Sequence, residues 1–240
     1  MKFKSHSDSL TLPGNPPLTI ALKWSRRNLG LRLKVVKHSG GKIEMSLPEC
    51  CSVKEAARFA KSKESWIREA LKTVPPVCRP QYGMNFPVEG KLLKIARGSG
   101  HTIIRTDTEL KVPELSVAVG EQILCWGYQY AYERAKKSSA MYAKKLGIAA
   151  SVKKVSIKDP ISRWGSCSRQ GNLMVSWRLI MAPYYVMEYV VAHEVAHLKE
   201  FNHSGRFYGV LEGLIPNSKA NELWLRRNGS SLFDFEFSKE

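Results

Sequence analysis

The pattern of hydrophobic and polar residues in the first third of the chain predicts β-strands. Residues 18–24 predict one strand, and residues 31–35 and 42–47 alternate between hydrophobic and polar side chains. Because side chains of a strand point alternately to its two faces, both alternating stretches predict half-buried strands. The turn sequence SGG at residues 39–41 lies between them, so we expect these two strands to form a hairpin.

Helical and strand-like patterns follow this hairpin. Ser52 and Glu55 have the spacing of a capping box, which predicts that a helix begins there. A second helical stretch covers residues 66–71. Residues 82–112 are then strand-like and are divided by glycines, which mark turns.

A shift in composition near residue 115 separates two regions of the chain. Residues 121–146 are strong helix formers, and Gly147 suits the position that directly follows a helix. We therefore expect an α+β fold. Its first part is a β-rich region with some helix over residues 1–114, and its second part is a separate domain over residues 115–240.

The charge of the chain is strongly unbalanced. Lys and Arg total 38 against 21 Asp and Glu, which gives a net charge of +17 and a pI near 9.8. Such a surface attracts polyanions. The basic residues are spread out along the chain, for example in residues 23–37 and 136–154, and aromatic residues are not interleaved with them as a nucleic-acid-binding motif. Two interpretations remain open, namely solubility with non-specific attraction, and association with nucleic acid.

Hydropathy and cysteine content favour a cytosolic protein. No apolar run approaches the roughly 18 residues of a membrane helix. Residues 1–13 are polar and lack the apolar stretch of a signal peptide. The five cysteines show no C-x-x-C spacing, so we expect free thiols and expect Cys125 to be a small buried hydrophobic residue.

A candidate metal site lies between residues 183 and 207. His193, Glu194 and His197 form an H-E-x-x-H pattern. Residues i and i+4 of a helix differ by about 40° around the axis and about 6 Å along it, so their imidazoles can converge on one ion. The intervening glutamate then lies beside the water that the ion binds. The stretch is apolar almost all round, which predicts a central, buried helix whose polar groups a metal would compensate.

His203 is the candidate third ligand. On a continued helix it would lie about 240° away from His197, so the helix must end between them. We expect residues 201–202 to make the break, because Asn202 tolerates the left-handed backbone conformation, and Ser204 to begin the next helix. A downstream carboxylate remains an alternative third ligand, and the candidates are Glu212 and Glu222.

These residues and their neighbours resemble the YgjP-like zinc metallopeptidases and, more weakly, the SprT and WLM types. The resemblance extends over nearly the whole chain. It is most specific in RWGSCS at 163–168, WRL at 177–179, HEVAHL at 193–198, NHS at 202–204 and Phe207. Three positions depart from the usual pattern without removing a metal or catalytic group, and the substrate groove is where we expect a change. They are Ser176, Glu188 and Tyr208.

The resemblance implies a minimal zincin-like metallopeptidase domain with the H-E-x-x-H helix at its centre and zinc as cofactor. It implies the same ligands as the spacing argument, His193, His197 and His203, with Glu194 as the general base. An extended peptide substrate is expected to add to a sheet edge beside the metal, and residues 162–177 are the candidate edge. Candidate donors to the reacting oxygen are Arg163, Tyr185 and Tyr208.

Two other functions remain open at this point. In the first of these, the chain is a basic binding protein that associates with nucleic acid and has weak or absent proteolytic activity. In a third reading the metal is purely structural, with Cys167 as a fourth ligand, since structural zinc usually has four protein ligands.

Overall fold

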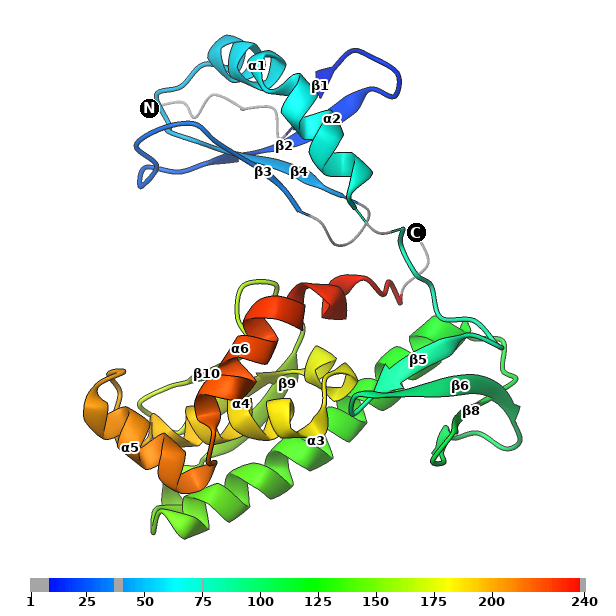
Figure 1. The fold of residues 1–240 in the computed structure, drawn as a ribbon, viewed down its shortest axis with the longest axis vertical. Coiled ribbons are helices and arrows are strands. Elements are labelled where there is room, and N and C mark those ends of the chain that lie inside the picture. Colours follow the sequence, from blue (N-terminus) through cyan, green and yellow to red (C-terminus); the bar gives the residue numbers. More distant parts are fainter. Residues whose placement is uncertain (1–8, 37–40, 75, 238–240) are drawn as a thin grey trace. The chain divides into compact units, whose positions relative to one another are not determined.

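The computed structural model describes residues 9–36, 41–74 and 76–237, which divide into two compact units (Figure 1). The first unit is Met1–Cys78 and the second is Arg79–Glu240. This division differs from the boundary near residue 115 that the composition suggested. The reason is that the strands before residue 115 share one hydrophobic core with the helices after it, including buried residues such as Phe86 and Ile123.

The N-terminal unit contains a four-stranded sheet with the order β1-β2-β4-β3. Its strands are β1 (Ser9–Leu12), β2 (Leu18–Trp24), β3 (Arg32–Val35) and β4 (Ile43–Leu47). Strands β2 and β4 are parallel, and β3 and β4 are antiparallel, which confirms the predicted pairing of the two alternating stretches. The turn predicted at residues 39–41 falls mostly outside the described residues, because 37–40 are not described. Strand β1 was not predicted from the sequence.

Two helices cover one face of this sheet, α1 (Val53–Ser62) and α2 (Glu64–Lys72). The predicted capping box is confirmed, because the Glu55 amide donates to Ser52 Oγ at 3.2 Å and the Ser52 amide donates to Glu55 Oε2 at 2.8 Å. The apolar faces of both helices pack on the sheet and form a core of their own with its inward side chains. The buried residues on the helices are Ala56, Ala60 and Ile67.

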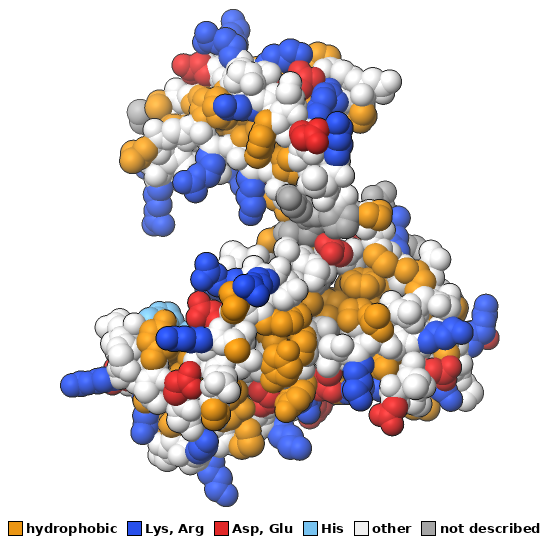
Figure 2. Space-filling view, in the orientation of Figure 1, with side chains coloured by type: hydrophobic (Ala, Val, Ile, Leu, Met, Phe, Trp, Pro, Cys, Tyr) orange, Lys and Arg blue, Asp and Glu red, His pale blue; other side chains and the backbone are white. Residues whose placement is uncertain are grey.

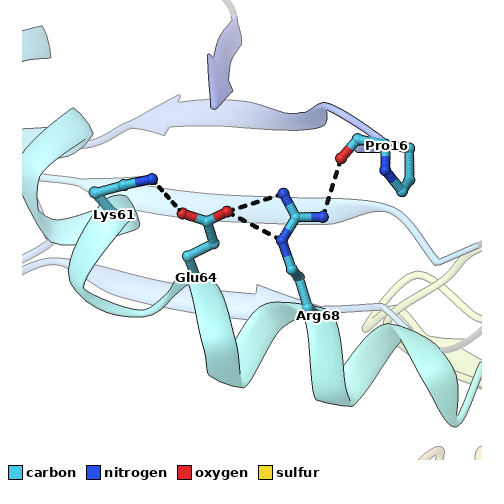
Figure 3. A network of polar contacts seen from close by, with 4 residues as sticks. All are labelled: Pro16, Lys61, Glu64 and Arg68. Atoms are coloured by element: carbon cyan, nitrogen blue, oxygen red, sulfur yellow. Dashed lines mark hydrogen bonds and ion pairs between the residues drawn. The ribbon is translucent and has the colours of Figure 1, made fainter. Parts of the chain in front are cut away.

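A polar network fastens α2 to the loop between β1 and β2 (Figure 3). Glu64 accepts hydrogen bonds from Lys61 at 2.6 Å and from Arg68 Nε and Nη2 at 3.0 and 2.9 Å. Arg68 Nη1 also donates to the Pro16 carbonyl at 3.0 Å. The guanidinium therefore joins a helix to a loop 52 residues away in the sequence.

The C-terminal unit begins with a second four-stranded sheet, of order β5-β6-β8-β7. Its strands are β5 (Asn85–Val88), β6 (Lys91–Gly98), β7 (Ile104–Arg105) and β8 (Glu109–Pro113), all within the predicted strand-like stretch. Its two central strands are parallel and both edge strands are antiparallel to their neighbours. The N-terminal sheet has the same arrangement, so the chain uses one pairing scheme twice.

The long helix α3 (Val119–Lys145) follows and ends before Gly147, whose φ of +69° confirms the predicted helix stop. A three-stranded sheet packs beside α3 and has the order β10-β11-β9, with β9 and β10 as its two edges. Its strands are β9 (Lys154–Lys158), β10 (Gly165–Cys167) and β11 (Asn172–Ser176). The 3-10 helix η1 (Ala149–Ser151) precedes β9, and the 3-10 helix η2 (Trp177–Met181) follows β11.

The helix α4 (Tyr184–Ala196) contacts α3, α6 and the three-stranded sheet (Figure 1). It is followed by α5 (Gly205–Leu214), α6 (Ser218–Asn228) and η3 (Gly229–Phe233). The mixed α+β class is thus confirmed. Cys125, in contrast, is exposed, so its predicted burial was wrong. None of the helices in the described ranges is both long and apolar enough to cross a membrane.

Candidate metal centre

The histidines and the glutamate of the motif lie at the end of α4 and in the turn that follows. His193 and Glu194 belong to the last turn of α4, His197 caps its C-terminus, and His203 lies just before α5. Nine residues of α4 are buried, on several sides of the helix, because hydrophobic side chains occupy nearly every position. This packing fixes the rotation of the helix about its axis and therefore the direction of both motif histidines.

The chain reverses after His197 by tightening the helix. The amides of Leu198 and Lys199 donate to carbonyls three residues earlier, each at 3.0 Å, instead of four residues earlier. Asn202 does not have a positive φ, so the left-handed turn predicted there was wrong. Ser204 begins α5 as predicted, since its hydroxyl accepts from the Phe207 amide. The reversal returns His203 to the side of α4.

The three imidazoles converge on one point. His193 Nε2 lies 3.2 Å from His197 Nε2 and 3.1 Å from His203 Nε2, and all three ligand atoms lie within 4.8 Å of one another. Tetrahedral coordination at Zn–N distances of about 2.0–2.1 Å places two ligand nitrogens about 3.3–3.4 Å apart. Two of the three separations are close to that value and the third is at most 4.8 Å, so the donor set can hold a single small cation.

Hydrogen bonding, packing and burial favour the neutral imidazole form of the histidines, which is the form that binds a metal ion. His197 Nδ1 lies 3.1 Å from the Glu200 carbonyl, which can only accept, so Nδ1 carries the proton and Nε2 keeps its lone pair. The fully buried Phe207 ring packs against all three imidazoles at centroid distances of 4.6–4.9 Å. Burial, with smaller contributions from the other two histidines, lowers the pKa of His193 to about 4, which keeps it neutral.

Glu194 is buried beside this cluster, with 6% of its surface exposed. Burial raises the pKa of Glu194 to about 8, and the positive charge of Arg163 acts in the opposite direction. A cation beside the carboxylate would also favour its ionised form. Strand β10 touches Glu194 directly, since a Cβ built on Gly165 would lie 2.5 Å from Glu194 Oε1. A side chain at position 165 would displace the Glu194 carboxylate, so glycine is required there.

A cavity of about 580 Å³ opens beside the histidines, and we call it the histidine cavity. It is bounded by α4, α6 and the start of β10, and a histidine side chain is visible at the surface in Figure 2. Its lining residues include His193, Glu194 and His203 on one side and Trp164, Tyr208 and Glu222 on others. A ligand that enters this cavity therefore meets both the imidazoles and the buried carboxylate.

Comparison with known proteins agrees with this chemistry. The family model of the YgjP-like metallopeptidase domain matches residues 31–228. The chain belongs to the YgjP-like metallopeptidase family. The search of solved structures finds the metallopeptidase zymogen of Pyrococcus abyssi abylysin at 24% identity and a TM-score of 0.35, covering 40% of this chain and 92% of that chain. The curated proteins contain no match.

The other candidate ligands of this YgjP-like chain lie apart from the cluster. Glu212 accepts hydrogen bonds from the Ser218 amide and hydroxyl at 3.1 and 2.7 Å, and Glu222 lies in the wall of the histidine cavity. The Cys167 thiol donates to the Ser168 carbonyl at 3.4 Å. Within the described residues, the group of ligand atoms that come together consists of the three histidines and includes none of these side chains.

The candidate oxygen donors and the family departures are distributed differently from what the sequence suggested. Tyr208 lines the histidine cavity, whereas Tyr185 does not. Glu188 faces α3, where it accepts hydrogen bonds from Ser138 at 2.6 Å and Tyr142 at 2.9 Å, so it does not belong to a substrate groove. The side chain of Ser176 is fully buried, with no hydrogen-bond partner for its hydroxyl in the described residues.

Two positions near the metal centre have roles that the sequence alone did not reveal. Gly165 lies within β10 and makes room for Glu194. Phe207, in α5, packs against all three imidazoles. Both positions belong to the stretches that carry the family resemblance, but no local pattern predicts these contacts, because they arise from packing between different elements.

Proposed function

We propose that this YgjP-like chain is a zinc-dependent peptidase that hydrolyses peptide bonds in protein or peptide substrates. His193, His197 and His203 hold the zinc ion, and Glu194 is the general base. The convergence of three Nε2 atoms beside a buried carboxylate carries this proposal. Three protein ligands leave one position of a tetrahedral site open, as in catalytic rather than structural zinc sites.

A bound zinc ion supplies an acidified water and polarises the scissile carbonyl group. Glu194 accepts the proton of the attacking water and returns it to the leaving amine. Its burial excludes competing solvent, and Gly165 keeps the carboxylate close to β10. His197 holds its ring in one orientation through the bond from Nδ1 to the Glu200 carbonyl. Tyr208, in the cavity wall, is the candidate donor to the developing oxyanion.

We further propose that α4 is the central helix of a minimal zincin-like domain and that β10 receives the substrate. In the part of the chain that the structure describes, strand β10 pairs with β11 alone, so its other edge is available for an extended peptide. Trp164 and Gly165, at the start of this strand, also line the histidine cavity. A peptide added to this edge would run beside Glu194 and the histidines.

The test is the variant Glu194→Gln, compared with Glu222→Gln, which changes a carboxylate in the wall of the same cavity. We expect Glu194→Gln to bind zinc as the wild type does and to cleave quenched-fluorescent peptides about 10²–10⁴-fold more slowly. Glu222→Gln should remain within a few-fold of the wild type. Retained cleavage by Glu194→Gln would refute the assigned role of this residue.

A further inference from the structure

The C-terminal half of α3 and the strand β9 form an unusually basic stretch. Residues 134–158 contain eight Lys and Arg residues and no Asp or Glu. The stretch runs from the middle of α3 through η1 to the end of β9. The chain as a whole has 21 acidic residues to 38 basic ones, so the basic charge is concentrated here beyond the general excess.

The lysines of this stretch, unlike its arginine, have no carboxylate partner in the described chain. Arg134 pairs with Glu89 and Glu188. Among the described residues, no carboxylate lies within ion-pair distance of the seven lysines, whereas Lys23, Lys61 and Lys72 in the N-terminal unit each have a carboxylate partner. The seven lysines are Lys136, Lys137, Lys144, Lys145, Lys153, Lys154 and Lys158.

Three of these lysines line one cavity of about 450 Å³ between α3 and the start of β9, which we call the lysine groove. They are Lys136 on α3 and Lys153 and Lys154 at β9, and no acidic residue of the described chain lines the groove with them. Tyr132 and the buried Ser139 add an aromatic ring and a hydroxyl to the wall. Ammonium groups that share a cavity repel one another, and a bound anion relieves that repulsion.

We propose that the lysine groove binds the backbone of a single-stranded nucleic acid. Four further lysines of α3 and β9 lie outside the groove, one of which, Lys145, donates to the Leu214 carbonyl at 3.4 Å. This additional positive charge suits a polymer of phosphates better than a single small anion. Proteins that bind single strands combine such a basic groove with an aromatic side chain on which bases stack, and Tyr132 provides the ring. Lys136 Nζ lies 5.7 Å from the centre of that ring. A membrane surface fits less well, because the lysines surround a hollow.

This binding site is independent of the proposed peptidase chemistry. The groove borders β9, and the histidine cavity borders β10, at the opposite edge of the same three-stranded sheet. Neighbouring strands are about 4.8 Å apart, so the two edge strands are separated by about 10 Å and by β11. Nucleic acid in the groove leaves the histidines accessible, and each site can be tested while the other is monitored.

The test is fluorescence anisotropy of a labelled 20-nucleotide oligothymidylate with the full chain, at several salt concentrations. The groove variant carries Lys136→Gln, Lys153→Gln and Lys154→Gln. The matched control carries Lys54→Gln, Lys91→Gln and Lys94→Gln, three exposed lysines elsewhere, and loses the same charge. We expect the groove variant to bind more weakly and the slope of log K against log salt to become shallower by about 2, since each single-strand phosphate contact contributes about 0.7.

The control triple variant should keep nearly the wild-type slope, and both triple variants should keep their zinc content and peptide cleavage. Equal losses of affinity in the two variants would show attraction by net charge alone and would overturn the proposal. Absence of oligonucleotide binding at low salt would also overturn it. The proposal would also be overturned if anionic phospholipid vesicles or polyglutamate displaced the labelled oligonucleotide more strongly than unlabelled oligonucleotide does at equal charge.

Discussion

The two edges of the three-stranded sheet are built in opposite ways. At the β10 edge, Gly165 touches a buried glutamate, and the neighbouring histidines are held by α4, by Phe207 and by a hydrogen bond to a carbonyl. At the β9 edge, the functional groups are exposed lysines without carboxylate partners in the described chain. The proposed metal centre depends on where each side chain lies, to within a fraction of an ångström. The proposed lysine groove depends on the amount of positive charge. Substitutions at the two edges should therefore differ in both size and kind.

The largest effect should come from removing a metal ligand at the β10 edge. We expect His203→Ala to weaken zinc binding by more than about 100-fold, because loss of a ligand costs more than loss of a group that only orients one. The thermal stabilisation that zinc gives to the wild type should decrease accordingly. Metal analysis of the purified protein and melting with and without zinc measure both effects.

The exposed His101 lies outside the cluster, so His101→Ala is the matched control and should bind zinc like the wild type. If His203→Ala retained full zinc content, the third ligand would have to be another group. Glu222, in the wall of the same cavity, would then be the first candidate.

A second, smaller effect should follow from adding one methyl group at the same edge. In Gly165→Ala the new Cβ would meet Glu194 Oε1 at 2.5 Å, so the carboxylate must move. A displacement of about 1 Å in a catalytic group costs about 10²-fold in rate, and we expect that loss of peptide cleavage with zinc content unchanged. Gly209→Ala, on α5 with open space around it, is the control. Unchanged cleavage by Gly165→Ala would mean that this contact does not position the base.

These two predictions use different kinds of information. The proposed ligands of the first could be predicted from the sequence, because residues four apart on a helix share a face. The choice of His203 over Glu212 or Glu222 additionally required a break in the helix. The contact in the second does not follow from sequence. Gly165 and Glu194 are brought together by packing of β10 against α4, and no local pattern specifies which residues of two such elements meet.

The prediction of the fold was limited in the same way, because local patterns do not specify long-range packing. Alternation predicted the pairing of β3 with β4, and the capping box predicted the start of α1, because both signals are local. The division of the chain was placed near residue 115, where the composition changes. Strands β5 to β8 nevertheless share a core with α3 and η2, and only long-range packing determines that grouping.

The smallest effect should come from the hydrogen bonds that join α3 to α4, between the two sites. Helix α3 carries part of the lysine groove, and α4 carries His193 and Glu194. Glu188 of α4 links the two helices by accepting hydrogen bonds from Ser138 and Tyr142 of α3. We expect Tyr142→Phe to lower the free energy of unfolding by about 1–3 kcal/mol, because a largely buried carboxylate loses a donor. Chemical denaturation measures this change.

Tyr128→Phe removes a hydroxyl for which the structure shows no hydrogen bond within the described residues, so it should change stability by less than about 0.5 kcal/mol. In folded Tyr142→Phe protein, zinc affinity and oligonucleotide affinity should both equal those of the wild type, because neither site contacts the Tyr142 hydroxyl. A selective loss of zinc affinity would show that the Glu188 network positions the histidines. A selective loss of oligonucleotide affinity would show that the Glu188 network shapes the lysine groove. Either result would contradict the expectation that this network stabilises the fold without affecting the two sites.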